Sequence, residues 1–98
     1  MVYAVIFRAV VGELDAEYTD AIERMKELAF NGYGCLEFFA LSDGEHRVAI
    51  SYWNSAEDIQ RWKRNSEHLQ AQALGKNKWY ESYSVQVVEV KREYSHGT

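Results

Sequence analysis

The residues from Val48 to Tyr80 constrain the fold more than any other part of the chain. An apolar run at their start leads directly into Ser55 and Asp58, and a Ser-x-x-Asp pair in this position favours the start of a helix. Apolar residues then recur at helical spacing as far as Gly75, with a break in the pattern near Asn65. The sequence therefore predicts a strand followed by two short helices that meet at an angle.

The remaining sequence predicts a further helix and an antiparallel hairpin. Asp15 is placed to cap a helix whose apolar residues keep the helical period until Asn31-Gly32 ends it. Asp43-Gly44 separates two apolar runs, which is a strong hairpin signal. Runs rich in β-branched and aromatic residues predict strands over residues 2–11, 34–41, 45–53 and 79–94.

The order of these elements is β-α-β-β-α-β, with the last helix split in two. This order is typical of the ferredoxin-like α+β arrangement, in which helices pack on one face of an antiparallel sheet. A chain of 98 residues is long enough for one domain with its own core. We therefore expect a single domain over residues 1–94 and a polar C-terminal tail over residues 95–98.

Both faces of the predicted sheet are apolar, whereas a sheet with one face in water should have one polar face. In the first strand, one face carries Ala4, Ile6 and Val10. The other face carries Tyr3, Val5, Phe7 and Ala9. A soluble monomer rarely exposes so much apolar surface, so we expect a homodimer formed through the sheet face that the helices leave open. The long last strand favours the same interpretation, because a typical strand has about five or six residues and this one would reach onto the partner.

The composition argues against several classes of partner. A formal net charge of -4 leaves no broad basic surface for phosphates, so nucleic acid is not expected. No apolar run is as long as a membrane span and the N-terminus lacks a secretory pattern, which predicts a cytoplasmic protein with no membrane partner. Cys35 is the only cysteine and is expected as a buried thiol. His46 and His96 have no other ligands at metal spacing, so no metal site is expected.

The run Ile50-Ser51-Tyr52-Trp53 before the Ser55 cap, then Trp62, then Ser66-Glu67-His68, resembles the antibiotic biosynthesis monooxygenase family. The resemblance extends from the first strand to the last and implies the family's fold, the dimeric α+β barrel. Members of this family include oxygenases that act on aromatic polyketides or quinols without a cofactor, and haem-degrading enzymes. In members with a known site, the ligand lies between the sheet and the helices of each subunit.

The resemblance implies a pocket for a small aromatic molecule in this chain. Its expected lining residues are Phe7, Tyr52, Trp62, Gln72 and Tyr83. His68 matches a position where the family often has histidine, and it is a candidate general base; the alternative is a structural histidine at a helix start. Trp62 either lines the pocket or simply fills the core.

Arg8 is a charged residue within an otherwise apolar strand, where an unpaired charge is costly. It is the second catalytic candidate, because a guanidinium can bind an anionic or phenolate ligand. The alternative is an ion pair with Glu37 or Glu89 on a neighbouring strand, or a side chain that reaches water at the strand end.

Three functions follow from this pattern. The first is a monooxygenase without a cofactor, in which an aromatic or quinol substrate itself reduces oxygen. The second is a dimer that binds a small hydrophobic molecule without catalysis, so the sequence does not decide whether the chain is an enzyme. The third is haem binding or degradation, which the pattern disfavours. The haem-degrading members carry an axial histidine where this chain has Gln72, and an asparagine in the first strand near the position of Phe7.

Overall fold

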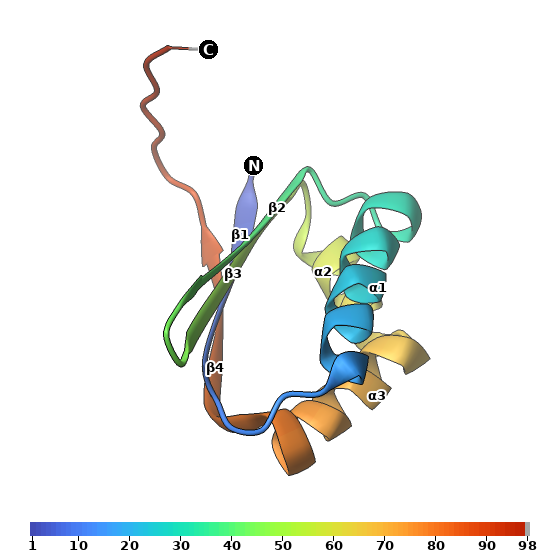
Figure 1. Ribbon diagram of the computed structural model, residues 1–98. Helices are drawn as coiled ribbons and strands as arrows, with labels where there is room; N and C mark the ends of the chain where they lie inside the picture. The colour runs from blue at the N-terminus through green and yellow to red at the C-terminus, as the bar shows by residue number, and fades with distance from the viewer. Residues whose placement is uncertain (98) are drawn as a thin grey trace.

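The computed structural model describes residues 1–97, apart from the side chains of residues 66, 67 and 77, and Figure 1 shows the arrangement of its elements. In chain order these are β1 (Tyr3–Val11), α1 (Ala16–Gly32), β2 (Glu37–Asp43), β3 (His46–Trp53), α2 (Ala56–Arg64), α3 (Ser66–Leu74), the π-helical turn η1 (Gly75–Trp79) and β4 (Tyr80–Glu89). No helix in residues 1–97 combines the length and the apolar character needed to cross a membrane.

The four strands form one antiparallel sheet in the order β2-β3-β1-β4. The helices α1, α2 and α3 all lie on the same side of this sheet (Figure 1). This is the ferredoxin-like α+β fold that the order of the elements predicted, including the split of the last helix into α2 and α3. The sheet therefore has a helix face, which the helices cover, and an open face on the other side.

Side chains cap the helices at the predicted positions. Asp15 Oδ1 accepts the backbone N–H of Tyr18 at 3.2 Å at the start of α1. Ser55 Oγ accepts the backbone N–H of Asp58 at 3.1 Å at the start of α2. The break between α2 and α3 has the same cause, because Asn65 Oδ1 accepts the backbone N–H of His68 at 3.3 Å and caps a new helix.

Two boundaries on the helix side differ from the expectation. β2 begins at Glu37 rather than at residue 34, because the backbone N–H of Cys35 still donates to Ala29 of α1 at 2.9 Å. The helical segment does not stop at Gly75, since η1 continues it for five residues and the N–H of the residue after η1 donates to the Gly75 carbonyl. A π-helical turn of this kind is frequent at functional sites.

The last strand is shorter than expected. β4 ends at Glu89 rather than at residue 94, because its partner β1 begins at Tyr3. One further backbone bond joins them, from the N–H of Val90 to the carbonyl of Val2 at 2.9 Å. Residues 91–97 then run away from the sheet as an extended tail (Figure 1).

The core lies between the helix face and the helices. Its buried residues are Val5, Met25, Ala29, Cys35, Trp53, Ile59 and Trp62. Cys35 is buried as predicted, and burial raises the pKa of its thiol. The strand register assigns to the open face the apolar residues Ala4, Ile6, Val10, Phe39, Leu41, Val48, Ile50 and Val88. Phe39 and Leu41 are 53% and 69% exposed. The open face therefore carries an apolar area on β1, β2 and β3, as the alternation predicted, whereas β4 contributes Ser82, Ser84 and Gln86 beside Val88.

Ser51 is a polar side chain within this core, where only 3% of it is exposed. Its hydroxyl accepts a hydrogen bond of 2.9 Å from the indole Nε1 of Trp53, which is itself fully buried. The two residues are neighbours on the helix face of β3, so the strand itself supplies the partner that the buried indole N–H needs.

We expect Ser51→Ala to lower the free energy of unfolding by about 1–3 kcal/mol, because it leaves a buried N–H without an acceptor. Urea denaturation followed by tryptophan fluorescence measures the change. Ser42→Ala, at an exposed position of β2, is the matched control and should be close to neutral. Equal effects of the two substitutions would contradict the proposed role of this hydrogen bond.

Candidate functional site

A cavity of about 120 Å³ lies between the helix face of the sheet and the helices. Its lining residues come from all the helices and from every strand of the sheet: Val5, Phe7, Ile22, Met25, Phe38, Ala49, Trp62, Lys63, His68, Ala71, Gln72, Trp79, Tyr80, Tyr83 and Val85. An apolar cavity of roughly 150 Å³ in an engineered protein holds one benzene molecule. The space in this chain therefore has the size of a single aromatic ring.

Three aromatic rings in mutual contact form one wall of this cavity. The ring of Phe7 on β1 lies 5.3 Å from that of Tyr80 and 5.8 Å from that of Tyr83, measured between centroids. The rings of Tyr80 and Tyr83 on β4 are 6.0 Å apart. Aromatic pairs at these distances stabilise one another beyond simple burial, so the wall is held in place by its own contacts.

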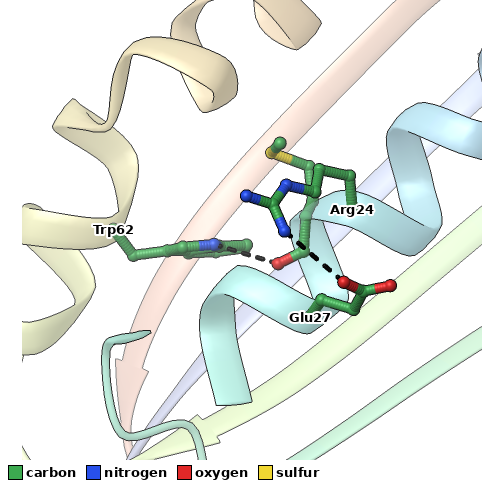
Figure 2. Close-up of polar contacts among 4 residues, drawn as sticks. Arg24, Glu27 and Trp62 are labelled. Carbon is green, nitrogen blue, oxygen red and sulfur yellow. Dashed lines mark hydrogen bonds and ion pairs between the residues drawn. The ribbon is translucent and has the colours of Figure 1, made fainter. Parts of the chain in front are cut away.

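Trp62 forms another part of the wall. Its ring lies 5.1 Å from that of Trp53 and 6.3 Å from that of Phe38, between centroids. Its indole Nε1 donates to the backbone carbonyl of Met25 in α1 at 3.2 Å, as Figure 2 shows beside the ion pair of Arg24 and Glu27 on the same helix. This bond joins α2 to α1 and fixes the plane of the indole. Trp62 therefore both fills the core and lines the cavity.

The segment that leads into β4 is held by Asp15. Besides capping α1, its carboxylate accepts the indole Nε1 of Trp79 at 3.1 Å and pairs with Lys78 Nζ at 2.5 Å. The Lys78 ammonium holds the pKa of Asp15 below its usual value. These contacts fix η1 against the start of α1, and η1 in turn places Tyr80 at the cavity.

Tyr80 is constrained from two further sides. A Cβ atom on Gly75 would lie 2.9 Å from two carbons of the Tyr80 ring, so only glycine leaves room for this ring at the start of η1. The Tyr80 hydroxyl donates to the hydroxyl of Tyr18 at 3.4 Å. Burial first, and then the contact with Tyr18, raises the pKa of Tyr80, so its hydroxyl stays protonated.

His68 supplies an unpaired nitrogen at the cavity. Its ring lies edge to face with the Trp62 ring at a centroid distance of 4.5 Å. Its Nδ1 is buried and has no hydrogen-bond partner among the described residues. Burial first, and then the positive charge of Lys63, lowers the pKa of His68 to about 4. The imidazole is therefore neutral at pH 7, and its Nδ1 lacks a hydrogen-bond partner among the described residues.

The structure brings together five of the seven predicted site residues. Phe7, Trp62, His68, Gln72 and Tyr83 all line the cavity. Arg8 and Tyr52 do not, because both lie on the open face of the sheet. Successive strand residues point to opposite faces, so Arg8 faces away from Phe7, and Tyr52 shares the open face with its register partner Ala4. Arg8 takes part in none of the ion pairs found among the described residues, so it is not paired with Glu37 or Glu89.

Two residues of the cavity were missed or undervalued by sequence reasoning. Lys63 lines the cavity and is only partly exposed, although the basic run around Trp62 suggested a solvated helix face. It supplies the positive charge that was expected from Arg8. Trp79 was read as the start of the last strand, whereas it lies in η1 and packs edge to face on Tyr18 at 5.3 Å. No local sequence pattern predicted the π-helical turn.

The arrangement suits a flat, largely apolar ring that carries a hydroxyl group. The walls of the cavity are mostly apolar and aromatic, His68 brings a nitrogen without a partner, and the positively charged Lys63 borders the same space. No group of three or more His, Cys, Asp or Glu side chains within residues 1–97 is arranged to hold a metal ion.

Comparison with known proteins gives a family match and a curated relative. A sequence model of the family described as "Antibiotic biosynthesis monooxygenase" matches residues 1–74. The protein YqjZ of Bacillus subtilis (strain 168), described as uncharacterized, is 39% identical over 92 residues, which cover 93% of this chain and 81% of that protein.

Solved structures share the fold at low sequence identity. SnoaB, a cofactor-independent oxygenase from Streptomyces nogalater, superposes with a TM-score of 0.80 at 12% identity, over 97% of this chain and 98% of that one. Rv0793 from Mycobacterium tuberculosis gives a TM-score of 0.82 at 16% identity, over 97% and 100% of the two chains. At these identities the likeness concerns the fold.

We expect His68 to make stability depend on pH between about 4 and 6.5. In this range the unfolded chain, whose histidine has its ordinary pKa of 6.5, binds a proton that the folded chain excludes until about pH 4. Stability should therefore rise with pH across the range. His68→Gln should flatten this rise when urea midpoints are measured as a function of pH, whereas His96→Gln in the tail should not. An NMR titration that gives His68 an ordinary pKa would contradict this account.

Proposed function

Because the chain belongs to the antibiotic biosynthesis monooxygenase family, we propose that it is a monooxygenase that oxidises a single-ring quinol without a cofactor. The observation that carries the proposal is the unpaired Nδ1 of His68 in an aromatic cavity of about 120 Å³. A buried nitrogen without a partner is costly, and a ligand hydroxyl would supply the missing hydrogen bond. The size of the cavity favours one ring over the larger ring systems of polyketides.

Oxygen would enter by direct reaction with the substrate anion. His68 Nδ1 takes the proton of a hydroxyl group, and the resulting phenolate gives electrons from a ring carbon to O₂. A new C–O bond forms there, the O–O bond then breaks, and the second oxygen atom leaves as water. For hydroquinone the balance is C₆H₆O₂ + O₂ → C₆H₄O₃ + H₂O, with a hydroxyquinone as the product. The substrate thus supplies all the electrons that reduce O₂.

The low pKa of His68 affects the proton transfer. An imidazole with a pKa of about 4 is a weak base toward a phenol, so the transfer is uphill until the phenolate forms beside the new imidazolium. Opposite charges attract strongly where water is excluded, and Lys63 adds a second positive charge at the cavity. The protein would therefore stabilise the anion by its surroundings more than by the strength of the base.

The same observation supports the second candidate, which is binding without catalysis. A neutral imidazole can accept a hydrogen bond from a ligand hydroxyl and never take its proton. Haem fits the residues poorly, because Gln72 offers an amide where an imidazole is needed and the cavity has the size of one ring. The activity assay below separates catalysis from simple binding.

We further propose that the chain forms a homodimer through the open face. The apolar residues of this face lie side by side on neighbouring strands, and the large ones Phe39 and Leu41 are among the most exposed apolar side chains of the chain. A second copy offers the same apolar face and so covers both at once, as in a dimeric α+β barrel. β4 contributes Val88 to this face, but the tail beyond Glu89 does not extend the sheet.

We expect the chain to accelerate oxygen consumption by hydroquinone above the rate of autoxidation, and His68→Gln to reduce kcat by about 10²–10⁴-fold. An oxygen electrode gives the rate, and mass spectrometry with ¹⁸O₂ should find one labelled atom in the product. His96→Gln, in the tail, is the matched control and should retain full activity. A chain that binds hydroquinone but leaves autoxidation unchanged would favour binding without catalysis.

We expect sedimentation velocity to find a dimer at micromolar concentration, and Phe39→Glu to convert it to a monomer, because the substitution places charges in the apolar interface. Phe30→Glu is the matched control: Phe30 is 40% exposed on α1, on the other side of the sheet, so this variant should remain dimeric. A monomeric wild-type chain, or equal behaviour of the two variants, would contradict the proposed interface.

A further inference from the structure

Arg8 is a cation without a partner in the middle of β1. Its side chain is exposed on the open face, between its register neighbours Val48 on β3 and Ser84 on β4. Within residues 1–97 it takes part in none of the ion pairs or side-chain hydrogen bonds. Because the side chain is exposed, its guanidinium can bind an anion from outside the chain without first breaking a contact with another residue.

A hollow of about 360 Å³ surrounds this guanidinium, at the end of the open face near the turn between β2 and β3. Val10 and Val48 give it apolar sides, and His46, Ser82 and Ser84 give it polar ones. The small serine side chains leave the space open beside the large residues of the same face. Tyr83 lines both this hollow and the cavity of Trp62 and His68, but Arg8, His46 and Ser84 line the hollow alone, so the two spaces differ in their polar groups.

The polar groups of this hollow are suited to an anion. None of its lining residues is acidic, although the chain as a whole carries a formal net charge of -4. Arg47 also lines the hollow, and its Nη1 donates to the carbonyl oxygens of Gly44 at 2.7 Å and His46 at 3.1 Å. Arg8 has no such bond among the described residues and is available to a ligand.

We propose that this hollow binds a small organic carboxylate. The planar guanidinium of Arg8 would hold the carboxylate through two parallel hydrogen bonds, with the hydroxyl groups of Ser82 and Ser84 beside it. The apolar part of the ligand would lie against Val10 and Val48. A carboxylate with an apolar body fits both halves of the hollow, whereas inorganic phosphate would leave the valine side unused. This proposal does not depend on the oxygenase reaction.

The proposed dimer bears on this site without replacing it. A second copy over the open face would close the hollow into a space between two sheets, which would strengthen the attraction between Arg8 and an anion. The other possible occupant is a carboxylate side chain of that second copy. In that case Arg8 would belong to the interface and no small ligand would bind, so the experiment must measure binding and assembly together.

The test is a titration of the ¹⁵N-labelled chain with benzoate, followed by NMR. We expect the amide signals of Arg8, His46, Ser82 and Ser84 to shift with benzoate and not with its neutral analogue benzamide. Arg8→Gln should weaken benzoate binding by about tenfold or more, because it removes a charged hydrogen-bond donor. Arg92→Gln in the tail changes the net charge equally and should bind as the wild type does.

Arg8→Lys provides a second variant if Arg8→Gln does not fold: it keeps the charge but loses the paired geometry, so benzoate binding should weaken less than with glutamine. Three results would overturn the proposal. The first is benzoate binding that is unchanged by both Arg8 variants, or that shifts only residues of the Trp62 cavity. The second is phosphate binding as tightly as benzoate. The third is a wild-type chain that ignores benzoate while Arg8→Gln raises the dimer dissociation constant, which would assign Arg8 to an ion pair between copies.

Discussion

The alternation of side chains along β1 is the constraint on which the rest of this structure depends. Because successive residues of a strand point to opposite faces, Phe7 enters the cavity under the helices and Arg8 enters the hollow on the other face. β1 is paired on both sides, with β3 and β4, so its register also fixes the faces of its neighbours. The alternation along one strand thus places Phe7 at the aromatic cavity and Arg8 at the hollow on the open face.

The cavity exists because large side chains hold the helices away from the sheet. Trp62 stands between α2 and β3 and is fixed by its bond to the carbonyl of Met25, while Asp15 holds the turn that precedes β4. The cavity is lined by aromatic and aliphatic side chains together with His68, whose Nδ1 is buried. The features that stabilise the fold and those that shape the cavity are therefore largely the same side chains.

The sequence predicted most of this fold because its main signals are local. Asp15 and Ser55 cap helices through bonds to residues three positions later, and Asp43-Gly44 lies in the turn between paired strands. The strand ends were harder, since some depend on distant partners: β4 ends at Glu89 because its partner β1 begins at Tyr3. Trp62, His68 and Gln72, which the family resemblance suggested, all line the cavity. Arg8 and Tyr52 were wrongly assigned to the cavity, although strand alternation alone puts Arg8 on the face opposite to Phe7. Lys63 was overlooked because the spacing of residues along one helix does not show which of them line a cavity.

The most direct test of the cavity as the functional site is an NMR measurement of contacts with hydroquinone in the absence of oxygen, so that no turnover occurs. The account predicts nuclear Overhauser effects from the ring protons of hydroquinone to the side chains of Trp62 and His68, and none to Tyr52 on the open face. Contacts confined to the open face, or no contact at millimolar hydroquinone, would contradict it.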